Sequence, residues 1–99
     1  MLDVLSYPNP FSNETYFTFI VVGSEMPEEI GIKIYTLTGR LIREFNIPQT
    51  ELLPGFNRIY WDGRDQDGDD IANGVYFYKV IMRTQIKTVE VIQKLAKVR

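Results

Sequence analysis

Hydrophobic residues recur at every second position in several short segments of this chain, with polar turns between them. Isoleucine occupies positions 30, 32 and 34, and alternation of this kind predicts a half-buried β-strand. The segments 15–22 (TYFTFIVV) and 75–82 (VYFYKVIM) are rich in β-branched and aromatic residues, which favour strands. No segment has a persuasive helical period. The pattern therefore predicts seven strands, at 2–6, 15–22, 30–35, 40–45, 56–61, 75–82 and 86–98.

Turn-forming residues separate these strands. Gly39 stands where a tight turn needs a positive φ, and the dipeptide Pro54-Gly55 marks a loop. The polar segment 62–73 forms a longer turn region. Short strands at this spacing predict an all-β fold, an immunoglobulin-like antiparallel β-sandwich that residues 1–99 form as a single domain. We expect Trp61 to anchor its core.

The composition excludes the catalytic mechanisms that depend on histidine or cysteine. The chain has 99 residues, a net charge of −2, no histidine and no cysteine. Without these residues there is no Ser–His or Cys–His nucleophile pair, no disulfide and no thiol redox motif. We therefore expect a protein that is not an enzyme and that uses no cofactor. The general basic surface of a nucleic-acid-binding protein is missing, and no apolar run is long enough to span a membrane.

The charges are distributed unevenly along the chain. Residues 1–30 carry five acidic side chains and no basic one, whereas residues 79–99 carry six basic side chains and one glutamate. One interpretation is a solvated final strand whose lysines prevent unwanted pairing at a sheet edge. The other is a docking role for the basic segment. The sequence leaves both interpretations open.

The segment Asp62–Asp70 contains five aspartates and suggests a calcium loop. If Gly68 is placed at the sixth position of such a loop, the first position is Gly63 and the twelfth is Gly74. The opening aspartate and the bidentate glutamate of a calcium loop are then both missing. Since aspartate and glycine are common turn residues, we favour a pair of turns over a calcium site and expect no metal.

Four groups of residues, taken in order, resemble a known family. They are Tyr7-Pro8-Asn9-Pro10-Phe11 before an aromatic strand; Ile30-x-Ile32-x-Ile34-Tyr35 followed by Gly39-Arg40-Leu41-Ile42; Trp61-Asp62-Gly63-Arg64-Asp65 with Gly68, followed by Asn73-Gly74-Val75-Tyr76-Phe77-Tyr78; and Lys94-Leu95-Ala96-Lys97-Val98. In this order they resemble the C-terminal sorting domain, type A, of the bacterial type IX secretion system. The immunoglobulin-like domain of the flagellar hook-capping protein shares the Trp-Asp-Gly and Gly-Val-Tyr pieces. The resemblance covers essentially the whole chain.

The resemblance implies a domain that is a non-catalytic sorting signal. Such a domain ends a longer precursor and is recognised by the outer-membrane translocon and its shuttle proteins. A surface sortase then removes the domain from many cargo proteins. The implied location is the periplasm in transit, and afterwards the outer-membrane surface or the extracellular space. The motif residues would have turn or structural roles: Pro10, Gly39, Arg40, Trp61, Asp62, Gly63, Gly68, Gly74 and Tyr76.

The final strand is where we expect a partner to bind. A terminal strand can offer both its edge and its end to a partner, and its cations would meet acidic groups there. The predicted partner-binding residues are Ile92, Lys94, Lys97, Val98 and Arg99. Two other functions remain as alternatives. One is a structural immunoglobulin-like module, hook-cap-like or a spacer, in a larger protein. The other is an accessory carbohydrate-binding domain, which would need exposed Tyr or Trp residues in a row.

Overall fold

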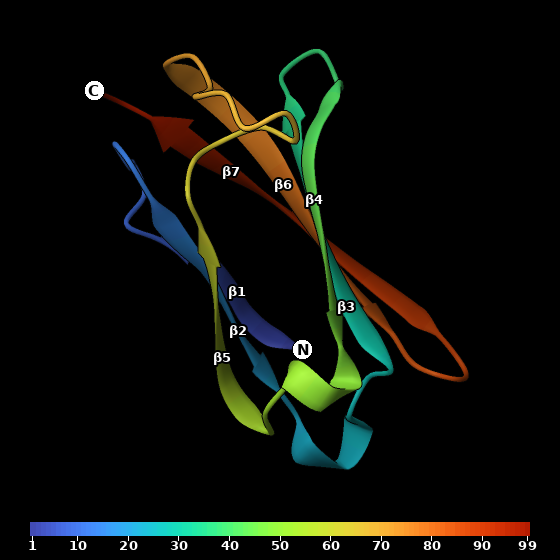
Figure 1. Cartoon of the computed structure of the whole chain (residues 1–99). Helices are drawn as coiled ribbons and strands as arrows, with labels where there is room; N and C mark the ends of the chain where they lie inside the picture. Colours follow the sequence, from blue (N-terminus) through green and yellow to red (C-terminus); the bar gives the residue numbers. More distant parts are fainter.

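Seven strands and two short 3₁₀ turns make up the regular structure of the chain (Figure 1). The computed structural model describes residues 1–99 except for the side chain of Glu25. None of the described residues belongs to a helix long and apolar enough to cross a membrane. The elements are β1 (Leu2–Tyr7), β2 (Thr15–Val21), η1 (Gly23–Glu25), β3 (Glu29–Thr36), β4 (Leu41–Pro48), η2 (Gln49–Glu51), β5 (Gly55–Trp61), β6 (Gly74–Arg83) and β7 (Thr88–Lys97).

The strands form two antiparallel sheets that lie face to face (Figure 1), one in the order β1-β2-β5 and the other in the order β4-β3-β6-β7. The prediction of an all-β, immunoglobulin-like sandwich of seven strands is confirmed. Strand limits differ from the predicted ones by a few residues. For example, β4 continues to Pro48 because its pairing with β3 extends to Glu29. The last strand begins only at Thr88, since the N–H of Thr84 donates to the carbonyl of Lys87 at 2.9 Å and closes a hairpin turn.

The core consists of inward-facing side chains from both sheets. Alternate residues of β2 are buried, which is the period of two that its sequence predicts. Trp61 is fully buried, as predicted, and its ring centroid lies 5.4 Å from that of Phe11 and 5.9 Å from that of Phe17. The indole N–H donates to the carbonyl of Arg64 at 2.9 Å. The aromatic cluster therefore fixes the segment after β5 against the core.

Two glycines are required by the local backbone. Gly39 has a φ of 92°, and its N–H donates to the carbonyl of Thr36 at 2.9 Å, which closes the turn between β3 and β4. Gly63 has a φ of 73°, and a Cβ atom at this position would lie 2.7 Å from the carbonyl oxygen of Asn13. The absence of a side chain at Gly63 lets the segment after β5 pack directly on the loop before β2.

Candidate partner-binding site

The predicted docking residues lie at the end of β7, an edge strand of the four-stranded sheet. The side chain of Ile92 is 60% exposed, and those of Lys94, Val98 and Arg99 are exposed as well. Lys97 differs from these four residues, because it is only 4% exposed and points to the inner side of the sheet beside the buried Leu95. Its burial follows from the strand period, since odd-numbered residues of β7 face the core. We therefore leave Lys97 out of the exposed docking surface.

The outer edge of β7 is partly occupied by the loop that follows β1. The N–H of Phe11 donates to the carbonyl of Ala96, and the N–H of Val98 donates to the carbonyl of Phe11, each at 2.9 Å. The side chain of Asn9 donates to the carbonyl of Lys94 and accepts from the N–H of Ala96, each at 3.1 Å. Figure 1 shows this loop beside the C-terminal end of the chain. We call the segment 9–11 and its bonds to residues 94–98 the terminal clasp.

The first half of β7 keeps an open edge. In the part of the chain that the structure describes, residues 88–92 have no backbone hydrogen bond outside their pairing with β6. Alternate residues of a strand direct their backbone N–H and C=O groups to the same side. The backbone groups of Glu90 and Ile92 therefore point away from β6, as those of Lys94 and Ala96 do. Figure 1 shows the β6–β7 hairpin extending beyond the other strands. The edge available for pairing is therefore nearer the hairpin than the sequence predicted.

A shallow groove lies beside this open edge on the outer face of the sheet. It has a volume of about 420 Å³ and is lined by residues that include Tyr35, Leu37, Phe77 and Ile92. The ammonium group of Lys79 lies 5.7 Å from the centroid of the Tyr35 ring and 3.4 Å from a carboxylate oxygen of Glu90. The groove is thus apolar at its floor and charged at its rim.

The segment Asp62–Asp70 has the geometry of turns. One carboxylate oxygen of Asp65 accepts hydrogen bonds from the N–H groups of Asp67 and Asp69, each at 3.0 Å. Side chains of the segment bond to their own backbone in this way, which is the usual function of aspartate in turns. Among the described residues, no group of three or more acidic side chains is arranged to hold a metal ion.

The same segment covers the opposite edge of the sheet. The N–H of Gln66 donates to the carbonyl of Ile42 at 2.8 Å, and its side-chain oxygen accepts from the N–H of Glu44 at 3.1 Å. Arg43 donates to the carbonyl of Arg64 at 3.0 Å and pairs with the carboxylate of Asp62 at 3.4 Å. One part of β4 is therefore closed to strand addition.

The remaining motif residues lie in different turns and strands and form no common site. Pro10 is in the terminal clasp, and Arg40 follows the turn at Gly39. Gly68 has a φ of 89° in the acidic segment, and Gly74, with a φ of 149°, begins β6. Tyr76 is buried, and its hydroxyl donates to the carbonyl of Ala72 at 2.6 Å.

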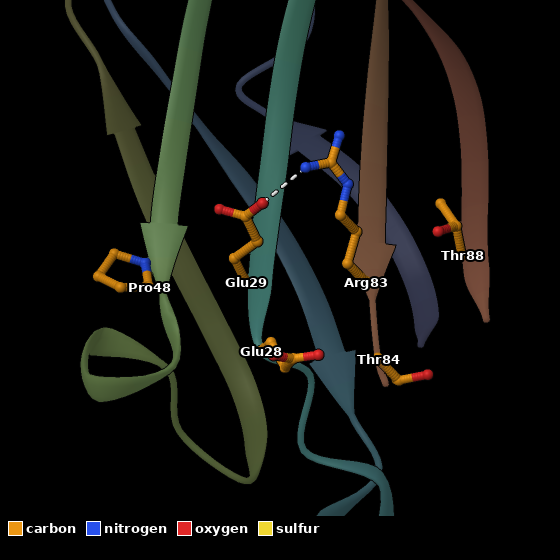
Figure 2. A pocket seen from close by; sticks show the side chains of 6 residues that line it. All are labelled: Glu28, Glu29, Pro48, Arg83, Thr84 and Thr88. Atoms are coloured by element: carbon orange, nitrogen blue, oxygen red, sulfur yellow. Dashed lines mark hydrogen bonds and ion pairs between the residues drawn. The ribbon is translucent and has the colours of Figure 1, made fainter. Parts of the chain in front are cut away.

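A further hollow lies at the end of the four-stranded sheet that is near the β6–β7 turn. Figure 2 shows that the side chains of Glu29 and Arg83 point toward one another across it. Nη1 of Arg83 lies 2.7 Å from a carboxylate oxygen of Glu29. Glu28, Thr84 and Thr88 complete most of its lining. Because Glu29 and Arg83 neutralise each other, the hollow presents no free charge from this pair.

Sequence reasoning missed two features of the surface. One is Asn9, whose only signal is its position between two prolines. The other is a cluster on the outer face of the three-stranded sheet, where the hydroxyl of Tyr60 donates to the carboxylate of Glu14 at 2.8 Å. This hydrogen bond to a negative acceptor raises the pKa of Tyr60. The register of β1, β2 and β5, which the sequence does not state, brings the cluster together.

Solved structures from two groups of bacterial proteins are similar to this chain. Dimeric latent PorU from Porphyromonas gingivalis matches 97% of the chain with a TM-score of 0.77 and 25% identity, over 9% of its own length. PorZ, an essential surface component of the type IX secretion system of the same organism, matches 97% of the chain with a TM-score of 0.62 and 23% identity, over 11% of its length. The chain thus spans about a tenth of these two proteins.

FlgD structures are similar as well. FlgD from P. aeruginosa matches 85% of the chain with a TM-score of 0.64 and 18% identity, over 59% of its length. Truncated FlgD from Helicobacter pylori matches 96% of the chain with a TM-score of 0.58 and 17% identity, over 68% of its length. No protein-family model matches the sequence, and no curated protein is significantly similar to it. The similar structures confirm the resemblance that the motifs predicted, to type IX secretion components and to the hook-capping protein.

Proposed function

We propose that the chain is a non-catalytic sorting domain of the type IX secretion system, the C-terminal part of a longer precursor. The observation that supports this most is the similarity of nearly the whole chain to a small part of PorU. In this proposal the outer-membrane translocon and its shuttle proteins recognise the folded domain in the periplasm. The domain then reaches the outer-membrane surface or the extracellular space, where a sortase removes it if the cargo is processed.

We further propose that β7 is the recognition element. Its open edge at Glu90 and Ile92 can pair with an added strand of the partner, and the neighbouring groove can accept an apolar side chain. Lys94 and Arg99 are exposed beyond this edge and would meet acidic groups of the partner. The terminal clasp protects one half of the edge, and the other half docks.

A proline at Ile92 separates edge pairing from folding. Because the N–H of this residue points away from β6, Ile92→Pro removes an outward donor and leaves the pairing with β6 intact. The domain is joined to an inert reporter with a signal peptide and produced in a type IX-secreting cell. We expect Ile92→Pro to reduce surface delivery roughly tenfold, the effect of losing about 1.4 kcal/mol of binding.

The control for this experiment is Ile92→Val, which keeps the N–H and an apolar side chain and should be delivered like the parent domain. The melting temperature of each purified variant verifies that it folds. Undiminished delivery of a folded Ile92→Pro domain would show that strand addition at this edge is not the means of recognition.

Charge reversal tests the cations independently. We expect the double variant Lys94→Glu with Arg99→Glu to lower delivery, because like charges would then face the partner. The matched control reverses two exposed cations near the opposite edge of the sheet, Arg40→Glu with Arg64→Glu. If both double variants reduce delivery equally, net charge matters and the position of the cations does not.

The similarity to FlgD supports a second candidate, a structural module of a larger protein. The fusion of the unmodified domain to the reporter distinguishes the two candidates. A sorting domain should carry the reporter to the surface, whereas a spacer should leave it in the periplasm.

A further inference from the structure

Three tyrosines form a row across the outer face of the three-stranded sheet. The strand register places Tyr7 opposite Tyr16, and Tyr16 opposite Tyr60. Tyr16 lies between two buried residues of β2, Tyr60 precedes the buried Trp61, and the hydroxyl oxygen of Ser6, next to Tyr7, is buried, so the three rings face the outer side. Tyr7 is 75% exposed and Tyr60 is 49% exposed. We call the row, together with Glu14 and Arg58, the tyrosine patch.

Side chains within the patch hold the rings in place. The centroids of Tyr16 and Tyr60 are 5.5 Å apart, with the rings inclined at 62°. The guanidinium group of Arg58 lies 4.6 Å from the centroid of the Tyr16 ring. The hydroxyl of Tyr60 is fixed by its hydrogen bond to Glu14. Tyr16 thus supports the patch, while the rings of Tyr7 and Tyr60 remain available to a ligand.

A hollow adjoins the row beside its central ring, Tyr16. It measures about 570 Å³ and is lined by Pro8, Ser12, Asn13, Glu14 and Tyr16 among others. The side chains of Ser12 and Asn13 have no hydrogen bond to another described residue. Polar groups that can still donate and accept therefore lie beside the central ring of the row.

We infer that the tyrosine patch and the adjoining hollow bind an oligosaccharide. A sugar ring has an apolar face of C–H groups, which packs on an aromatic ring, and a rim of hydroxyl groups, which needs hydrogen-bonding partners. The patch supplies both kinds of contact within one shallow surface. This function is independent of the docking by β7, which uses the other sheet.

A protein contact is the competing occupant, and the composition of the face separates the two. The opposite end of the same sheet face carries Leu2, Ile20 and Phe56. A mixed row of the exposed Leu5, Thr18 and Arg58 lies between that end and the tyrosines. The apolar end suits a protein surface better, whereas the tyrosine end combines rings with the hydroxyl of Ser12 and the amide of Asn13, which have no hydrogen bond to another described residue. The tyrosine end therefore favours a sugar.

The test uses the purified 99-residue chain on an array of defined glycans, followed by titration of the best-binding oligosaccharide. We expect binding that Tyr7→Ala and Tyr60→Ala each weaken roughly tenfold, equivalent to about 1.4 kcal/mol. Phe56→Ala is the matched control, since Phe56 is an aromatic residue of the same sheet face with 61% exposure. It should leave the affinity unchanged. The unfolding midpoint of each variant verifies its fold.

Two results would overturn the inference. One is a silent array. The other is equal weakening by Phe56→Ala and Tyr7→Ala, which would show that binding does not depend specifically on the tyrosine patch. If the array is silent while the tyrosine variants impair surface delivery of the reporter, the patch is a protein contact. Because the glycan array needs no secretion system, failure of the sorting proposal would leave its result unaffected.

Discussion

Gly63 lies so close to the loop before β2 that the fold leaves no room for a side chain. A Cβ atom there would also lie 3.2 Å from the ring of Phe11, in addition to its collision with the backbone of Asn13. Gly68 also has a positive φ, but no atom lies within 4 Å of its would-be Cβ. The two glycines therefore separate the effect of backbone conformation from the effect of close packing.

We expect Gly68→Ala to lower the free energy of unfolding by about 1 kcal/mol, for the positive φ alone. Gly63→Ala should lower it by about 3 kcal/mol, because backbone atoms must also move. Urea unfolding of both variants measures the difference. Equal losses would show that the loop shifts without strain to accept the added carbon.

At the scale of elements, each edge of the four-stranded sheet is covered in part by a side-chain amide from a distant loop. Asn9 covers the end of β7 and Gln66 covers the middle of β4. We expect Asn9→Ala to speed hydrogen exchange at the N–H of Ala96 and to cost about 1 kcal/mol of stability. Gln66→Ala should speed exchange at Glu44 and leave Ala96 unaffected. Unchanged exchange at Ala96 in Asn9→Ala would contradict the clasp geometry.

The strands could be predicted from sequence because each is encoded locally, by a period of two and by the turns at its ends. The buried position of Trp61 was predicted from its residue type, because a single large indole supplies much of the contact area of a small core. The terminal clasp was not, since Asn9 and Ala96 are 87 residues apart and no local pattern relates them. The burial of Lys97 was not predicted because lysine is seldom buried, and the strand period outweighed that preference here.

At the scale of the whole molecule, the pH dependence of stability follows from buried tyrosines. The sequence has no histidine, so no imidazole titrates between pH 5 and 8. Burial raises the pKa of Tyr76 and of Tyr78 in the folded protein. An unfolded tyrosine ionises near pH 10, so their contribution is fully present below about pH 10 and is lost as the pH rises toward the folded-state pKa.

We expect the melting temperature to fall steeply above about pH 10. Tyr78→Phe should make this alkaline decline shallower, because one group that ionises on unfolding has been removed. The control is Tyr7→Phe, which changes an exposed tyrosine in the same way. Thermal unfolding followed by circular dichroism between neutral and alkaline pH measures the effect. Parallel declines in the parent and in Tyr78→Phe would contradict it.

The terminal clasp also determines how the domain responds to mechanical force. Phe11 and Lys97 are bridged in parallel, so both segments run in the same direction. Tension between the two ends of the chain pulls these segments in opposite directions along their own axes. The hydrogen bonds of Phe11 and Asn9 to residues 94–98 then share the load in shear, and they do not open one after another. A domain held at its last strand while a load pulls on its first therefore resists extension along the line of pull.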